Sequence, residues 1–185
     1  MSVGLFLGTF DPPHIGHVNV VTSALNSDIV DKVIVVPAYK NLWKNTLTSH
    51  SIRTTMTECA FKGVRGVVVS DIEATLNNGE PVPSYMTIDW FNENYEGIII
   101  TTQETYSEIP KWEKGEEIMA NNKFLVICQG HFGDIMRRET DLAVYAPNIS
   151  ICSSNIREKI RTGQIAIPFI SSTVAGIIKT LNMYK

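Results

Sequence analysis

Short apolar runs rich in β-branched residues alternate with helical patterns along this chain, and that alternation constrains its fold more than any other feature. The expected strands are Gly4–Leu7, Lys32–Val36, Gly66–Ser70, Gly97–Thr101, Phe124–Cys128 and Ile149–Ile151. The expected helices are Gly16–Leu25, Ser51–Phe61, Tyr85–Asn92, Glu116–Ala120, Ser154–Thr162 and Ser171–Asn182. This order favours βαβ units around a parallel sheet, and the apolar strands indicate that both faces of the sheet are covered. We predict one α/β domain over residues 1–185, with irregular segments at 76–84, 103–115 and 129–148.

The run Gly8-Thr9-Phe10-Asp11-Pro12-Pro13-His14-Ile15-Gly16-His17 joins the first expected strand to the first expected helix. Ligands of open parallel sheets bind beyond the carboxyl ends of the strands, where a helix N-terminus also favours an anion. Gly8 and Gly16 would let a ligand approach the backbone closely. His14 and His17 can donate hydrogen bonds to phosphate oxygens, so the run predicts a phosphate site.

Two other interpretations of this histidine pair stay open. A metal site would need further His, Cys or acidic ligands, and no cysteine lies near. A purely structural turn would leave both histidines without a ligand. The chain contains neither G-x-G-x-x-G nor G-x-x-x-x-G-K-[ST], which disfavours a nicotinamide dehydrogenase and a P-loop enzyme.

A second candidate phosphate site lies in the run Ile149-Ser150-Ile151-Cys152-Ser153-Ser154-Asn155-Ile156-Arg157. The serine pair is expected to cap a helix, and its hydroxyls and the helix amides can bind phosphate oxygens. Arg157 follows one turn after Ser154, and its planar fork suits a phosphate. The alternative is an ordinary serine cap followed by a surface arginine.

Both runs resemble signatures of the HxGH nucleotidylyltransferase superfamily, and within it the nicotinate or nicotinamide mononucleotide adenylyltransferases. The resemblance implies a Rossmann-like doubly wound sheet. It also implies adenylyl transfer from ATP, which carries Mg²⁺, to one of the two mononucleotides, with nicotinate favoured. The products would be a dinucleotide and pyrophosphate, a step of NAD biosynthesis. The protein itself is expected to hold no metal. Catalysis would fall to His14, His17 and Arg157.

The resemblance also assigns binding residues to the two substrates. The ATP site would contain Gly8, Thr9, Phe10, His14, Gly16, His17, Glu104, Ile151, Ser153, Ser154 and Arg157. The mononucleotide site would contain Thr9, Phe10, Lys44, Ser84, Tyr85, Thr87 and Trp112. Trp112 would stack on the pyridine ring, while a partly buried loop tryptophan is the alternative. Lys44 and Lys40 are candidates for a phosphate or, equally, surface lysines.

Other segments between the two signatures match the family less closely. Arg53 belongs to a helix that resembles the family's R-x-x-M segment, where a structural role is usual, and Asp71-Ile72-Glu73 resembles its D-x-E strand end. Met86 stands where the family has threonine, and Thr102-Gln103-Glu104 replaces its G-x-D. Ser84 and Thr87 would cap a helix or present amides to the pyridine substituent. These departures keep two alternatives open: another HxGH transferase, of phosphopantetheine or cytidylyl type, and a non-catalytic nucleotide-binding module.

Composition limits the partners of this chain. Its 185 residues suffice for one domain, and its net charge of −3 implies no broad basic surface for nucleic acid. Cys59, Cys128 and Cys152 are expected to be buried hydrophobes in a reducing compartment. Without a run of about 18 apolar residues or a cleavable leader, we expect a cytoplasmic protein that does not enter a membrane. The sequence leaves the oligomeric state open, a homo-oligomer included.

Overall fold

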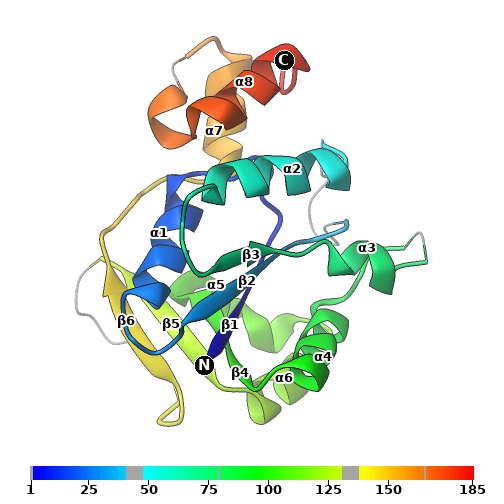
Figure 1. Cartoon of the computed structure of the whole chain (residues 1–185), viewed down its shortest axis with the longest axis vertical. Helices are drawn as coiled ribbons and strands as arrows, with labels where there is room; N and C mark the ends of the chain where they lie inside the picture. Colours follow the sequence, from blue (N-terminus) through cyan, green and yellow to red (C-terminus); the bar gives the residue numbers. More distant parts are fainter. Residues whose placement is uncertain (1, 41–47, 79, 131–137, 165) are drawn as a thin grey trace.

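The computed structural model describes residues 2–40, 48–78, 80–130, 138–164 and 166–185, and it contains a six-stranded sheet in the order β3-β2-β1-β4-β5-β6 (Figure 1). Every neighbouring pair of strands is parallel. The strands are β1 (Val3–Gly8), β2 (Lys32–Pro37), β3 (Val67–Val69), β4 (Gly97–Thr102), β5 (Phe124–Gln129) and β6 (Leu142–Ala146). This strand order is that of the doubly wound Rossmann-like sheet, so the predicted fold is confirmed.

Helices connect the strands and cover both faces of the sheet (Figure 1). They are α1 (Ile15–Leu25), α2 (His50–Phe61), α3 (Ile72–Leu76), α4 (Ser84–Asn94), α5 (Gln103–Glu108), α6 (Gly115–Asn121), α7 (Ser153–Arg161) and α8 (Ser172–Thr180), with 3₁₀ turns η1 (Ile109–Lys111) and η2 (Ile167–Phe169). Because side chains alternate along a strand, Phe6 joins the core cluster under α1 while its neighbour Leu5 joins the cluster under α4, α5 and α6. None of the helices among the described residues is long and apolar enough to cross a membrane.

The last two helices, α7 and α8, pack on α2 rather than on the sheet (Figure 1). Met56 of α2, Ile156 of α7 and Val174 of α8 are all fully buried in this third cluster. The cluster places the N-terminus of α7 against the turn that precedes α1, although the two chain termini lie at opposite ends of the molecule (Figure 1).

Three elements differ from the sequence prediction. The sixth strand is Leu142–Ala146, not Ile149–Ile151, because the chain pairs with β5 before it turns toward α7. Helices α3 and α5 lie in segments without a long apolar period, and each buries one side chain, Glu73 and Tyr106.

The cysteines also differ from the prediction that all three are buried. Cys128 is buried as expected, Cys59 is half-buried, and Cys152 is exposed at the start of α7.

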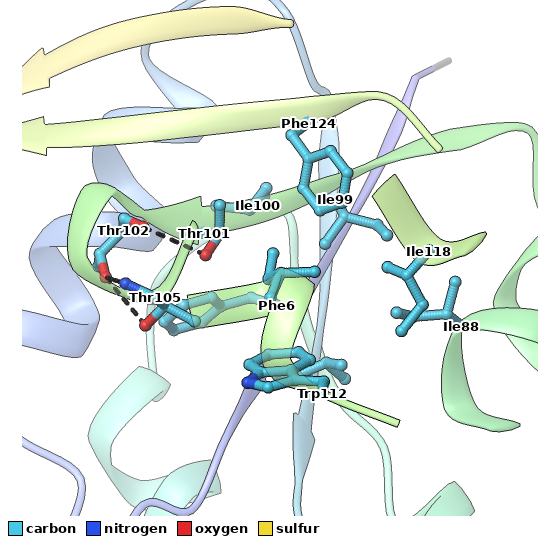
Figure 2. A pocket seen from close by; sticks show the side chains of 12 residues that line it. Phe6, Ile88, Ile99, Ile100, Thr101, Thr102, Thr105, Trp112, Ile118 and Phe124 are labelled. Atoms are coloured by element: carbon cyan, nitrogen blue, oxygen red, sulfur yellow. Dashed lines mark hydrogen bonds between the residues drawn. The ribbon is translucent and has the colours of Figure 1, made fainter. Parts of the chain in front are cut away.

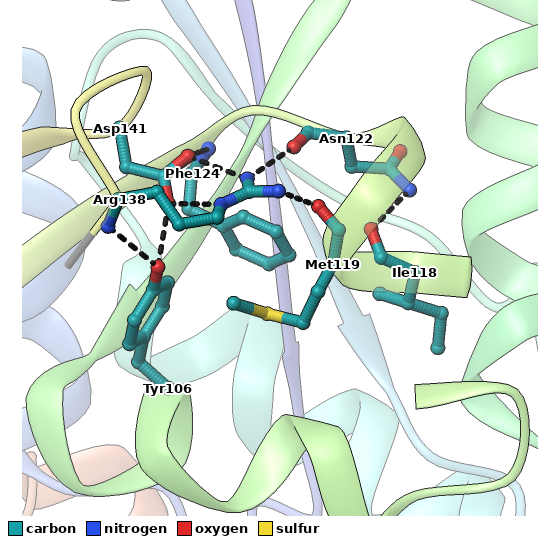
Figure 3. A network of polar contacts seen from close by, with 7 residues as sticks. All are labelled: Tyr106, Ile118, Met119, Asn122, Phe124, Arg138 and Asp141. Atoms are coloured by element: carbon teal, nitrogen blue, oxygen red, sulfur yellow. Dashed lines mark hydrogen bonds and ion pairs between the residues drawn. The ribbon is translucent and has the colours of Figure 1, made fainter. Parts of the chain in front are cut away.

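A buried carboxylate anchors the start of the edge strand β6 (Figure 3). Asp141 accepts hydrogen bonds from the backbone N–H of Phe124 at 3.1 Å, from the Tyr106 hydroxyl at 2.6 Å and from Arg138. Arg138 also donates to the carbonyl oxygens of Met119 and Asn122 at the end of α6. The network fixes residues 138–141, which lead into β6, at the amino-terminal edge of the sheet, opposite the site described next.

Candidate active site

The strand order reverses between β1 and β4, and the segments that follow these two strands form the candidate site. The turn from Gly8 to His17 follows β1 and leads into α1. The α5 helix follows β4 directly, and Thr102 is its N-cap, with a hydroxyl that accepts a bond from the Thr105 N–H. Glu104 is exposed in the first turn of α5, at the same edge of the sheet as the turn.

The two histidines of the turn form a reciprocal capping box at the N-terminus of α1. Nδ1 of His14 accepts from the Gly16 N–H at 3.2 Å, and Nδ1 of His17 accepts from the His14 N–H at 3.1 Å. Their ring centroids are 3.8 Å apart. An Nδ1 that accepts carries no proton, so each neutral ring has its proton on Nε2, which is a hydrogen-bond donor.

This arrangement changes how the turn would bind an anion. The amides of His14 and Gly16, expected to be free for phosphate, are already bonded to the imidazoles. The Nε2–H groups therefore replace these amides as the candidate donors to an anion. Burial lowers the pKa of His14 to about 4, which keeps this ring neutral near pH 7. His14 also lines an open cleft between α1 and residues 170–171.

The two glycines of the turn are required by packing within the protein. A Cβ at Gly8 would lie 2.8 Å from the Phe10 ring, and one at Gly16 would lie 2.9 Å from the His14 ring. Phe10 has a φ of 52° and its ring is buried against His17 at a centroid distance of 4.8 Å. The expected room for a ligand is thus filled by side chains of the turn itself. Any ligand contact of Phe10 must come from its backbone.

The second signature lies directly against this turn. Ser153 donates from Oγ to the Pro12 carbonyl at 2.9 Å, and Arg157 donates from Nη1 to the Asp11 carbonyl at 2.6 Å. Arg157 also donates from Nη2 to Ser154 Oγ at 3.3 Å. The serines do not cap α7 as expected, because the N-cap is Cys152 and has no side-chain hydrogen bond. Ile151, which precedes it, is half-buried against the third cluster.

A further contact to the turn comes from a residue that the sequence analysis did not single out. The Tyr184 hydroxyl donates to Asp11 Oδ1 at 2.6 Å and accepts from Thr48 Oγ1 at 3.2 Å. Asp11 is 2% exposed, so its carboxylate is held inside the protein. The two partners of this contact lie 173 positions apart, and no local motif signals such a pairing.

Three of the residues expected at the mononucleotide site, Ser84, Tyr85 and Thr87, lie in the first turns of α4. Ser84 and Tyr85 are half-buried in its first turn, and the N-cap Pro83 makes no side-chain hydrogen bond. Lys114 Nζ lies 4.0 Å from the centroid of the Tyr85 ring. Thr87 is fully buried, and its hydroxyl donates to Glu73 at 2.9 Å. The Thr87 side chain therefore neither caps α4 nor reaches a ligand, which corrects the expectation for that side chain.

Trp112 lines a small cavity at the carboxyl ends of β1 and β4 (Figure 2). Ile88 of α4 and Thr102 and Thr105 at the start of α5 line the same cavity. Trp112 is half-buried and follows η1, so its place is compatible both with stacking on a pyridine ring and with a structural role in the loop.

The two candidate lysines differ in what can be said of them. Lys44 lies outside the described residues, whereas Lys40 is described and exposed. Within the described ranges, no group of three or more His, Cys, Asp or Glu side chains could hold a metal ion.

Comparisons with known proteins identify the family and the fold. The cytidylyltransferase-like family model matches residues 5–159. A Thermotoga sp. (strain RQ2) protein named "Probable nicotinate-nucleotide adenylyltransferase" is 30% identical over 93% of this chain and 92% of its own length. A Gemmatimonas aurantiaca protein of the same name is 25% identical over 100% of this chain and 93% of its own length.

A solved structure has the same architecture. The Plasmodium falciparum nicotinic acid mononucleotide adenylyltransferase complexed with NaAD superposes with a TM-score of 0.81 at 21% identity. The superposition covers 99% of this chain and 97% of the other. At this identity the likeness concerns the fold alone.

Proposed function

The chain belongs to the cytidylyltransferase-like family, and from this premise we propose that it transfers the adenylyl group of ATP to nicotinate mononucleotide. The observation that carries the proposal is the contact between the two phosphate signatures, where Ser153 and Arg157 bond the carbonyls of Pro12 and Asp11 beside the paired histidines. The names of the curated relatives support nicotinate as the acceptor. We also propose that residues 1–185 form one domain.

In the proposed reaction, a 5′-phosphate oxygen of the mononucleotide attacks the α-phosphorus of ATP. The bond from that phosphorus to the oxygen shared with the β-phosphate breaks, and pyrophosphate leaves with the electron pair. The nucleophile is already an anion, so no enzyme-bound intermediate or general base is required. Catalysis then consists of holding the two phosphates in line and stabilising the charge that moves to the leaving group.

His14 and His17 supply donors for that charge. Each Nδ1 is fixed by a backbone N–H, so the orientation of each Nε2–H is set before substrate binds. A donor that is already oriented needs no reorganisation during the reaction, which is the main source of electrostatic catalysis. We assign the α- and β-phosphates to this pair, with His17 nearer the reacting phosphorus.

The second signature would bind the far end of the triphosphate. Ser153, Ser154 and Arg157 lie at the start of α7, where the helix amides lack a side-chain cap and the dipole favours an anion. Arg157 can keep one nitrogen on Asp11 and offer the rest of its fork to the β- and γ-phosphates. Mg²⁺ enters with ATP as part of the substrate and would be held mainly by the phosphates.

The mononucleotide would lie across the start of α4 and Trp112. The N–H groups of Ser84 and Tyr85 in the uncapped first turn can donate to a pyridine carboxylate, and Trp112 offers an aromatic face to the pyridine ring. Glu104 at the start of α5 is assigned to a ribose hydroxyl of ATP. Lys44 remains assigned to a substrate phosphate by resemblance alone.

Pyrophosphate release from MgATP tests this function, with nicotinate mononucleotide in one reaction and nicotinamide mononucleotide in another. We expect faster release with nicotinate mononucleotide and near-complete loss in His17→Ala. Binding of ATP without release of pyrophosphate from either acceptor would contradict the proposal and favour the non-catalytic module.

The description of the matching family model favours cytidylyl transfer as a second candidate function. Replacing ATP by CTP in the same assay separates the two. Faster pyrophosphate release from CTP than from ATP, with either mononucleotide as acceptor, would favour the cytidylyl reaction.

A further inference from the structure

Arg53 of α2 is fully buried and bonds three backbone carbonyls from three different segments. Nη1 donates to Thr9 in the active-site turn at 2.7 Å, Nη2 donates to Tyr39 after β2 at 2.7 Å, and Nε donates to Thr48 at 3.1 Å. Arginine suits this role because its planar fork offers donors in several fixed directions. The end of β2 is thus tied to the turn that follows β1.

Glu73 of α3 continues the same connection toward α4. It is 3% exposed, and its two carboxylate oxygens have different partners. Oε2 accepts from the Tyr39 N–H at 2.6 Å, and Oε1 accepts from the Thr87 hydroxyl at 2.9 Å. Tyr39 is therefore held at its N–H by Glu73 and at its carbonyl by Arg53.

An unbroken chain of hydrogen bonds consequently runs from Thr9 through Arg53, Tyr39 and Glu73 to Thr87. One end is the turn assigned to the phosphates, and the other is the first turns of α4, assigned to the pyridine. A buried carboxylate is costly to desolvate unless it is fully bonded, so its bonds resist small movements of its partners. These buried polar bonds add direction to the apolar packing of α4 on the sheet and so constrain its position relative to the turn.

We propose that Glu73 is a positioning residue for the mononucleotide, which holds the first turns of α4 at a fixed place relative to the Gly8–His17 turn so that the acceptor phosphate meets the α-phosphate of ATP. This inference rests on the proposed function, because it assigns α4 to the mononucleotide. The Gly8–His17 turn has further supports in Arg157 and Tyr184. Loss of the Glu73–Thr87 bond should therefore weaken binding of the mononucleotide and leave binding of ATP unchanged.

The test is steady-state pyrophosphate release by the full chain, with each substrate varied at saturation of the other. In Thr87→Val, which has nearly the shape of threonine but no hydroxyl, we expect KM for nicotinate mononucleotide to rise about tenfold. We expect KM for MgATP to change by less than about twofold, and Thr87→Ser to restore the wild-type KM. Glu73→Gln keeps the shape of the side chain and is expected to change the same KM in the same direction.

Thr57→Val is the matched control. Thr57 is also fully buried, and its hydroxyl donates at 2.7 Å to the Arg53 carbonyl within α2. It is expected to change neither KM. A purely structural role for Glu73 would lower the active fraction, which reduces kcat and leaves both KM values unchanged.

Unchanged KM for the mononucleotide in folded Thr87→Val and Glu73→Gln would overturn the inference while leaving the proposed function intact. An equal rise of both KM values would overturn it as well. If Glu73→Gln fails to fold, the two KM values of Thr87→Val alone test the inference. Absence of turnover by the wild-type protein would overturn the proposed function, and this inference with it.

Discussion

The two ends of the candidate site are built differently. At the phosphate end, the side chains named by the motifs face one another: His14 and His17 form a reciprocal pair, and Arg157 bonds the turn that carries them. At the pyridine end, the motif residues Glu73 and Thr87 bond each other inside the protein. Ser84, Tyr85 and Trp112 remain half-buried at the surface.

This difference shows that a motif can mark either the groups that touch a ligand or the groups that hold them. The phosphate end needs oriented donors, and short local hydrogen bonds within one turn suffice to orient them. The pyridine end is assembled from α4 and the segment after η1, which are separate elements of the fold. Its geometry therefore depends on buried polar bonds between elements, and the following experiments separate the two ends.

His17→Ala should have the largest effect, because it removes one donor fixed at the reacting phosphate. We expect kcat to fall by about 10²–10³. Pyrophosphate release measures the loss, and the melting temperature shows that the protein is folded. A folded variant with wild-type turnover would remove the proposed role of the turn.

The buried carboxylate at the pyridine end should give stability an unusual pH dependence. Burial raises the pKa of Glu73 from 4.5 to about 7. Between these values the folded protein holds a proton that the unfolded chain has lost, so the Glu73 contribution to stability decreases as pH rises from about 4.5 to 7. A pKa rise of this size corresponds to a total change in unfolding free energy on the order of 3 kcal/mol.

Urea denaturation of wild type and Glu73→Gln at several pH values measures this contribution. The difference in unfolding free energy should shift in favour of Glu73→Gln as pH rises through this window. The lowered pKa of His14 gives the opposite slope, with stability gained as pH rises from about 4 to 6.5, and it cancels in the difference. A difference that stays constant with pH would show that the Glu73 carboxylate is not perturbed.

Arg157→Lys should weaken the use of MgATP without changing the binding of the mononucleotide. Lysine cannot bond the Asp11 carbonyl and a phosphate through one planar fork, so we expect kcat/KM for MgATP to fall about tenfold. KM for the mononucleotide should stay unchanged. Arg161→Lys is the matched control on the same helix, since Arg161 is exposed and bonds Glu158. Equal effects of both substitutions would argue against a phosphate contact.

Trp112→Ala should have the smallest effect on turnover, because it changes only the binding of the pyridine ring. Loss of one stacked aromatic face is expected to raise KM for nicotinate mononucleotide about three- to tenfold, with KM for MgATP unchanged. Trp112→Phe should recover most of the affinity. Trp90→Ala serves as control, because Trp90 packs against Tyr95 at the far end of α4. No change in Trp112→Ala would favour the interpretation as a loop tryptophan.

The sequence predicted the sheet and its parallel strands because those signals are local, whereas the two phosphate sites stay predictions. Apolar runs such as Phe124–Gln129 identify buried strands, and the run from Gly8 to His17 identifies a strand-to-helix turn. The edge strand β6 was misplaced because its residues are mostly half-buried or exposed and its pairing is decided by β5. The alternation of Ile149 and Ile151 was the stronger local signal, yet the chain there leads to α7.

The missed contacts at the site are those made between distant residues or by unusual ones. Histidine is not a common N-cap, so nothing indicated that His14 and His17 would occupy the amides of their own turn. Arg53 was expected to be a structural arginine, and its hydrogen bonds to three backbone carbonyls agree with that expectation. Which carbonyls it would bond depends on tertiary structure and could not be derived from a motif.

The bond from Tyr184 to Asp11 has a consequence for how the protein is made. During synthesis, Asp11 emerges 173 residues before the partner that fixes its carboxylate in the folded protein. Until then the ribosome-bound chain holds an active-site turn without this support, and contacts of such large sequence separation form late in folding. The nascent protein can therefore build much of its sheet before Tyr184 has emerged, while the Asp11 contact of its candidate site forms only afterwards.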